Sequence, residues 1–181
     1  MKKILGLILF FTLPSMLAAQ TYTPKTVGSK WVFKMGDNSF TDKIIEGTFS
    51  FSGKDYFKSL RKYSWGDEDV TYFRVDSTGT VVYLDPKSKL ESVDVPGQPK
   101  IGDSWVSSDK AWKYEIIDTS ATFKTPKQTF KDCLIIKAEQ TTNRDKEKLQ
   151  TYFNYYVKGI GYVGSKVDDG LMAYIESWAV K

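Results

Sequence analysis

Ser107 and Lys110 have the spacing of an S-x-x-K motif, in which a lysine one helical turn after a serine acts as its base. The residues around them are typical of a turn, and the sequence lacks the accompanying motifs of penicillin-recognising enzymes. The chain also contains no histidine, so the imidazole base of Ser-His-Asp and Cys-His nucleophiles is missing. The sequence therefore predicts no activated nucleophile, and we expect a protein that is not an enzyme.

Metal and cofactor sites have equally little support. A zinc site of histidine and cysteine cannot form, because Cys133 is the only cysteine and histidine is absent. The acidic runs Asp67–Asp69 and Asp168–Asp169 offer oxygen ligands for calcium, but they lack the alternating spacing of an EF-hand loop. Short acidic runs are usual in hairpin turns. We expect neither a metal nor a cofactor.

Paired carboxylates of the kind that glycosidases use remain an alternative, because such pairing is spatial. It would require two acidic side chains about 5 to 10 Å apart in an open cleft, one of them with a raised pKa. Candidate pairs are Glu46 with Glu139 and Glu115 with Glu176. Each of the four candidate glutamates lies on the polar side of an amphipathic strand, which indicates a solvated face.

Aromatic side chains are in excess, with 27 Phe, Tyr and Trp among 181 residues. In the last predicted strand Tyr174 and Trp178 share one face and Ile175 the other, so both faces carry apolar area. Either one face packs the core while the other lines a concave surface, or a tightly curled sheet carries aromatics on its outside, since strand propensity alone enriches them. For a concave surface we expect an aromatic lining of Trp31, Phe73, Trp105, Phe153, Tyr155 and Trp178.

These side chains must be positioned by β-strands. The sequence patterns typical of strands run from Trp31 nearly to the last residue. Turn residues recur every eight to twelve positions, as at Asp76–Gly79 and Asp169–Gly170, and no window has a helical stripe. The fold class predicted is all-β: a strongly curved antiparallel sheet of about eleven strands, forming a half-barrel or open barrel.

A short pattern occurs twice in the sequence. Thr71–Arg74 is followed by Gly79, and Thr151–Asn154 is followed by Gly159 at the same interval. Upstream of each copy lies an apolar-Gly-x-x-Trp-Val segment, at 27–32 and 101–106. These repeats predict two related halves, residues 20–96 and 97–181, joined near the proline-rich segment 96–99. Trp31 and Trp105, and likewise Phe73 and Phe153, should then occupy equivalent places.

The first 19 residues have the features of a secretory signal, with Lys2 and Lys3 before an apolar run and small residues at its end. Residues 20–181 would then form a single all-β domain that is exported to the periplasm or the cell exterior. The apolar run is too short to span a bilayer, so we expect no integral membrane segment. No cysteine lies directly after the run to carry a lipid, so we expect no lipid anchor either. Cys133 is expected to be a buried small apolar residue.

Charge sets a further limit on partners. The whole chain has 26 basic and 22 acidic residues, a net charge of +4. Removal of the signal would remove two basic residues and no acidic one, so the net charge would fall to about +2. A balance this close gives no long-range field to gather nucleic acid or an anionic membrane. We expect no nucleic-acid partner.

The Gly28-x-x-Trp31 and Gly102-x-x-Trp105 segments, with the strand at 130–136 and the segment 155–163, resemble a broad family of uncharacterised exported β-rich proteins of gram-negative bacteria. The resemblance covers nearly all of the mature chain. It implies a curved antiparallel half-barrel like the lipoprotein carrier and receptor of the Lol pathway, with a binding or carrier role and no catalytic residues. A lipocalin-like barrel is the second resemblance, but this chain has G-x-x-W in place of G-x-W and no helix after its last strand.

Together these features predict an exported, non-catalytic binding or carrier module of the cell envelope. Its partner would be an apolar small molecule or a protein segment held on the concave face. The alternatives are the carbohydrate-active enzyme with paired carboxylates and a structural interaction protein of the cell surface.

Overall fold

A computed structural model describes residues 21–142 and 150–181, which form one antiparallel sheet of twelve strands. The all-β class and the curved, open barrel predicted from the sequence are confirmed. The strands are β1 (Lys30–Met35), β2 (Asn38–Phe51), β3 (Lys54–Tyr63), β4 (Glu68–Val75), β5 (Val81–Asp85), β6 (Leu90–Val95), β7 (Ser104–Val106), β8 (Trp112–Lys124), β9 (Thr129–Gln140), β10 (Thr151–Val157), β11 (Gly161–Val167) and β12 (Gly170–Ala179).

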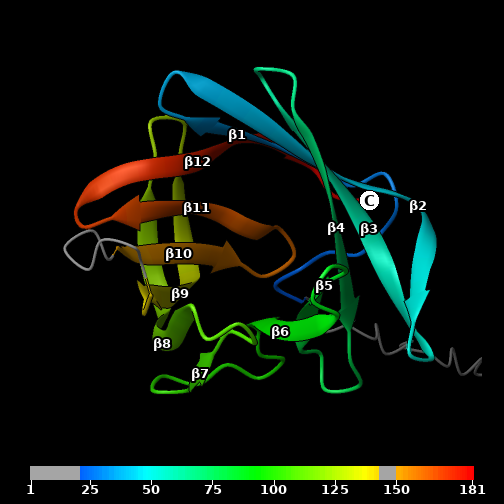
Figure 1. The fold of residues 1–181 in the computed structure, drawn as a ribbon. Coiled ribbons are helices and arrows are strands. Elements are labelled where there is room, and N and C mark those ends of the chain that lie inside the picture. Colours follow the sequence, from blue (N-terminus) through cyan, green and yellow to red (C-terminus); the bar gives the residue numbers. More distant parts are fainter. Residues whose placement is uncertain (1–20, 143–149) are drawn as a thin grey trace, which may run out of the picture.

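The sheet curls almost into a closed barrel. Its strand order is β6-β5-β4-β3-β2-β1-β12-β11-β10-β9-β8-β7, and it turns through 318° before it stops at an open seam between β6 and β7. Figure 1 shows the strands arranged around a central space, with β6 and β7 meeting at the bottom of the view. A curled sheet of this kind has an inner face that packs on itself and an outer face that meets water.

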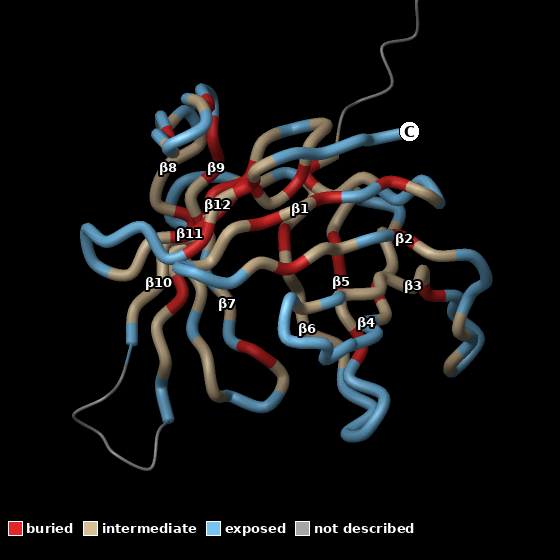
Figure 2. The backbone as a smooth tube through the Cα atoms, turned by 90° about the horizontal axis from the view of Figure 1, so that it is seen from above, coloured by how far each residue is buried: buried red, intermediate tan, exposed pale blue. Residues whose placement is uncertain are grey.

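Alternating side chains explain why these segments form strands. In β2 the inward Phe40 and Ile44 are buried, whereas Lys43 next to Ile44 points outward and is exposed. Turn chemistry ends the strands where the sequence predicts: Gly79 adopts φ +86° between β4 and β5, a conformation that favours glycine. In Figure 2 the buried stretches lie within the strands, and the outer loops are exposed.

The sequence repeat is visible as two meanders of six strands, β1–β6 and β7–β12. Every strand of the first set stands six places from its counterpart in the second, so β1 corresponds to β7 and β4 to β10. The start of each half is built alike: the Gly28 amide donates to the Ile44 carbonyl (2.9 Å), and the Gly102 amide donates to the Ile116 carbonyl (2.8 Å). Strand pairing leads from Trp31 through Asp42 and Arg61 to Asp69, and from Trp105 through Tyr114 and Ala138 to Tyr152, so the two tryptophans hold equivalent positions. In this register Phe73 corresponds to Tyr156, so the predicted equivalence of Phe73 and Phe153 is wrong.

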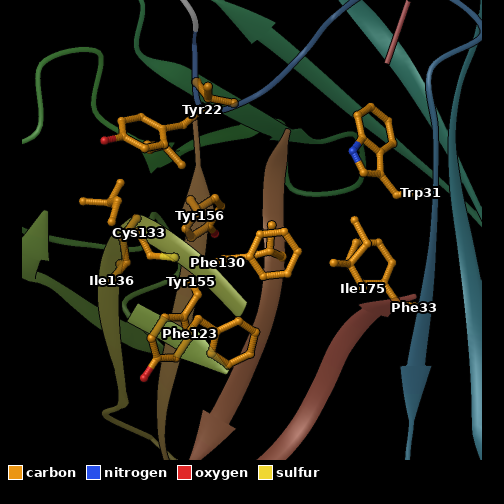
Figure 3. Packing of buried hydrophobic residues seen from close by; sticks show 14 of the residues in the cluster. Tyr22, Trp31, Phe33, Phe123, Phe130, Cys133, Ile136, Tyr155, Tyr156 and Ile175 are labelled. Carbon is orange, nitrogen blue, oxygen red and sulfur yellow. The ribbon is translucent and has the colours of Figure 1, made fainter. Parts of the chain in front are cut away.

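Both halves contribute to a dense aromatic core, part of which Figure 3 shows. The rings of Phe123 and Tyr155 stack with their centroids 4.2 Å apart, and Cys133 beside them is fully buried, as the sequence predicts. Gly164 lets β11 approach this layer, because a Cβ at its φ of +152° would lie 2.4 Å from the Ala173 carbonyl oxygen. The core therefore depends on a glycine at this position.

The two halves differ at their junctions. β1 pairs with β12 through a backbone ladder, whereas the equivalent strands β7 and β6 form none. Side chains connect them instead: the Trp105 indole donates to the Val93 carbonyl (2.9 Å), and the Ser108 amide donates to the Ser92 hydroxyl (3.0 Å). The seam is thus open in its backbone but held by side-chain hydrogen bonds.

The structure differs from the sequence prediction in the number of strands, and one prediction concerns residues that it does not describe. Twelve strands are present instead of about eleven, and the three-residue β7 is too short to show an alternating pattern. The predicted signal at 1–19 lies outside the described residues. Within the described part of the chain, no helix is long and apolar enough to cross a membrane.

Candidate functional site: a cavity inside the barrel

The barrel contains a partly open cavity of about 440 Å³, set between β1–β6 on one side and β10–β12 on the other. Much of its wall is aromatic or aliphatic, although charged and hydroxyl groups from several strands also face it. The apolar lining includes Trp31, Phe33, Met35, Phe40, Ile44, Phe73 and Ile160, and the polar lining includes Asp42, Arg61, Tyr83, Asp94, Asn154, Tyr156 and Tyr162. An apolar cavity with a few convergent polar groups is the usual form of a small-molecule site.

Asp42 and Arg61 form a two-pronged ion pair on one wall. They lie directly opposite each other on β2 and β3. The Arg61 Nε and Nη2 atoms each donate to one carboxylate oxygen of Asp42 at 2.7 Å, and the guanidinium lies 4.4 Å from the centroid of the Phe40 ring. Both charges are therefore already matched, and both Asp42 oxygens are occupied.

Asp94 is placed in the cavity by an irregularity of the edge strand β6. Val81 pairs with Val95 and Val82 with Val93, so Asp94 is the extra residue of a β-bulge. A bulge re-aims side chains, and here Asp94 faces the cavity while Val95 next to it is buried in the core. Asp94 is half-buried, and burial raises the pKa of its carboxyl group to about 6.

Tyrosines surround the Asp94 carboxyl group from other strands. The hydroxyl of Tyr156 in β10 donates to Asp94 Oδ1 over a long 3.4 Å. Burial, and next the charge of Asp94, raises the pKa of Tyr83 and of Tyr156. The same two causes raise the pKa of Tyr114 in β8. These phenols stay protonated at neutral pH, so they can donate hydrogen bonds.

Tyr162 adds a further hydroxyl to the lining. It donates to the Ser165 hydroxyl at 2.8 Å, and burial raises the pKa of Tyr162 to about 12. On the same side of the cavity, the Trp31 indole donates to the Ile160 carbonyl at 2.7 Å. Because the indole nitrogen is used in that bond, the part of Trp31 that lines the cavity is its apolar ring. The wall near the β10–β11 turn is thus fixed before any ligand arrives.

Two of the six aromatic residues predicted to line a concave surface, Trp31 and Phe73, do line this cavity. The other four lie elsewhere. Trp105 stacks on Tyr114 at the seam, Tyr155 stacks on Phe123 in the core, Phe153 is half-buried against that core, and Trp178 packs near Phe130 with 37% of its surface exposed.

The other sequence candidates for chemistry lie outside the cavity. The Ser107 hydroxyl donates to Asp109 at 2.5 Å and accepts from the Trp112 amide, so it stabilises a turn. None of the four candidate glutamates lines the cavity, and Glu139 is paired with Lys137. Among the described residues, no group of three or more Cys, Asp and Glu side chains is placed to hold a metal ion.

The charged residues that line the cavity are not predicted from the sequence. For two of them, however, the neighbouring residues in the sequence give an indication. Asp42 lies between Phe40 and Ile44 on one strand face, and Arg61 shares its face with Tyr63. A charge flanked by apolar residues at i±2 is unusual for a solvated face. Asp94 has no such signal, because a bulge cannot be read from an alternating pattern.

Comparison with protein-family models, curated proteins and solved structures finds no match to this chain. The resemblance to exported half-barrel proteins therefore remains a prediction.

Proposed function

We propose that this protein is an exported, non-catalytic carrier that holds a small amphipathic molecule inside its barrel. The observation that carries the proposal is the cavity of about 440 Å³, which the protein's own side chains leave open. Its size is within the range of about 300–1,000 Å³ typical of small-molecule sites. Its mixed lining fits a ligand with an apolar body and a polar end.

Barrel closure favours a small molecule over a protein segment. A segment laid on a concave sheet needs a broad open face, whereas this sheet turns through 318° around its interior. The side-chain hydrogen bonds across the β6–β7 seam further narrow the opening. A ligand inside the barrel loses contact with water over its apolar body, and this loss is the main source of affinity for such a body.

The carboxylates of the cavity favour binding over catalysis. A glycosidase mechanism needs a second carboxylate that is free to act as nucleophile or base. Asp42 is the other acidic residue of the lining, and both of its oxygens accept hydrogen bonds from Arg61. The carbohydrate-active alternative therefore has no observation in its favour.

Binding of N-phenyl-1-naphthylamine, a small dye that is neutral at pH 7 and brightens in apolar surroundings, tests the proposal. Ser59 lines the cavity from β3, so Ser59→Leu should fill space there and weaken dye binding at least tenfold. Ser50→Leu, on an exposed position of β2, is the matched control and should bind like the native protein. Circular dichroism checks that both variants fold.

Failure of the native protein to bind the dye, or equal binding by folded Ser59→Leu, would overturn the proposal. If the native protein binds the dye, native mass spectrometry of protein purified from its host without detergent should show a bound small molecule. The proposed export has its own test: secreted material should begin near Gln20.

A further inference from the structure

Asp94 is the one charge of the cavity lining without an opposite charge beside it. Asp42 and Arg61 neutralise each other, so ionised Asp94 leaves the cavity with one net negative charge. Five ion pairs occur within residues 21–142 and 150–181, and none of them includes Asp94. Its carboxylate accepts one hydrogen bond there, from Tyr156, at a distance close to the limit for such a bond.

A carboxylate without an ionic partner is costly in a partly buried site, because burial removes water that would stabilise its charge. The half-buried carboxylate of Glu91, by contrast, has several partners: it accepts two hydrogen bonds from Arg74, at 2.6 and 3.0 Å, one from Tyr56 and one from Lys54. Asp94 lacks this protection, although a bulge in β6 specifically directs it inward. Its placement is explained if the missing partner is supplied by the ligand.

We infer that the cavity selects a ligand with an apolar body and a protonated amine, whose ammonium group lies against the Asp94 carboxylate. This inference rests on the proposed carrier function. The tyrosine rings of the lining support it, because aromatic faces also attract cations. An anionic ligand is disfavoured, since the Arg61 fork is already used by Asp42. A neutral alcohol would form a hydrogen bond with Asp94 but no ion pair.

The inference also predicts how binding depends on pH. Burial raises the pKa of Asp94 to about 6, so its carboxylate is mostly protonated at pH 5 and ionised at pH 7.5. The groups that face it are Tyr83 from β5, Tyr114 from β8 and Tyr156 from β10, each with a raised pKa, so none of them ionises in this range. Affinity for an alkylammonium should therefore rise as the pH increases through about 6.

Three ligands with the same ten-carbon chain test the head-group preference: decylammonium, decanol and decanoate, each used below its micelle-forming concentration. At pH 7.5 they compete with N-phenyl-1-naphthylamine for the native protein. Decylammonium should bind at least tenfold more tightly than decanol, and decanoate more weakly than both. Asp94→Asn should lose the preference for decylammonium over decanol. Asp169→Asn, which removes an exposed turn carboxylate, should keep it.

The possible failures are distinguishable. If the dye and all three ligands fail to bind, the carrier function falls and the inference with it. If they bind but the native protein does not prefer the ammonium, the inference alone is wrong. An ammonium preference that survives in Asp94→Asn, or that does not weaken between pH 7.5 and pH 5 in the native protein, would also overturn it.

Discussion

Asp94→Asn should make the empty protein more stable at neutral pH, because it removes an ionised carboxylate that has no ionic partner. Burial raises the pKa of Asp94 to about 6 from an ordinary value of 3.8. A tenfold change in proton affinity corresponds to about 1.4 kcal/mol, so the ionised side chain costs the folded state on the order of 3 kcal/mol. Asparagine has nearly the same shape and can still accept the Tyr156 hydrogen bond, but it carries no charge.

The sign of the pH dependence follows from where the proton is held more tightly. Between pH 4 and pH 6 the folded state binds more protons at Asp94 than the unfolded state does, so its contribution to the free energy of unfolding falls as the pH rises. Above pH 7 both states are ionised and the loss is constant. Asp94→Asn should thus match the native protein below about pH 4 and exceed it by about 3 kcal/mol at pH 7.5.

Urea unfolding between pH 4 and pH 8, followed by tryptophan fluorescence, measures this difference. With a slope of about 2 kcal/mol per molar urea, the midpoint of Asp94→Asn should lie roughly 1.5 M above that of the native protein at pH 7.5. Asp169→Asn should show no such increase. A pH-independent difference, or a variant less stable than the native protein at pH 7.5, would refute the reasoning, because ionised Asp94 would then be stabilised in the empty fold.

Three further variants or probes test the fold. Trp105→Phe keeps the stack on Tyr114 but loses the bond to Val93, so amide exchange in β6 should accelerate about fivefold, as expected for about 1 kcal/mol; unchanged exchange would mean that this bond does not hold the seam. Gly164→Ala should lose more than about 3 kcal/mol in urea unfolding, because its Cβ meets the Ala173 carbonyl, and near-native stability would contradict the packing. Cys133, buried and with its pKa raised to about 11 by burial, should react with a thiol reagent at pH 8 only after unfolding; rapid reaction would show that the core opens.

Much of the fold can be predicted from the sequence, because local rules determine it. Alternating side chains identify the long strands, and glycine turns such as Gly79 fix where they reverse. The degree of closure cannot be predicted in this way. Curvature depends on bulges, and an extra residue such as Asp94 becomes visible only when its strand is paired with a neighbour.

The candidate site is predictable only in part, for a related physical reason. Trp31 and Phe73 are large inward residues of central strands, so composition and periodicity suggest them. Trp178 has the same composition signal, yet it lies on the outside because a curled sheet leaves apolar area on both faces. The side chains that give the cavity its chemistry are few, charged and spread over β2, β3 and β6, and only the closed sheet brings them together.

The repeat and the site depend on different positions of the two halves. Since Ile44 corresponds to Ile116, Asp42 corresponds to Tyr114. Since Asp42 pairs with Arg61 and Tyr114 with Ala138, Arg61 corresponds to Ala138. The ion pair of the first half is therefore replaced by neutral residues in the second.

The repeated glycines and aromatics build two similar walls, while the charges, including Asp94 on β6, come from the first wall alone. A ligand with two equivalent polar ends would leave one of them facing neutral side chains. The asymmetry of the lining thus favours a ligand with a single charged head, directed toward β6, and an apolar body that extends across the cavity toward Trp31 and Ile160.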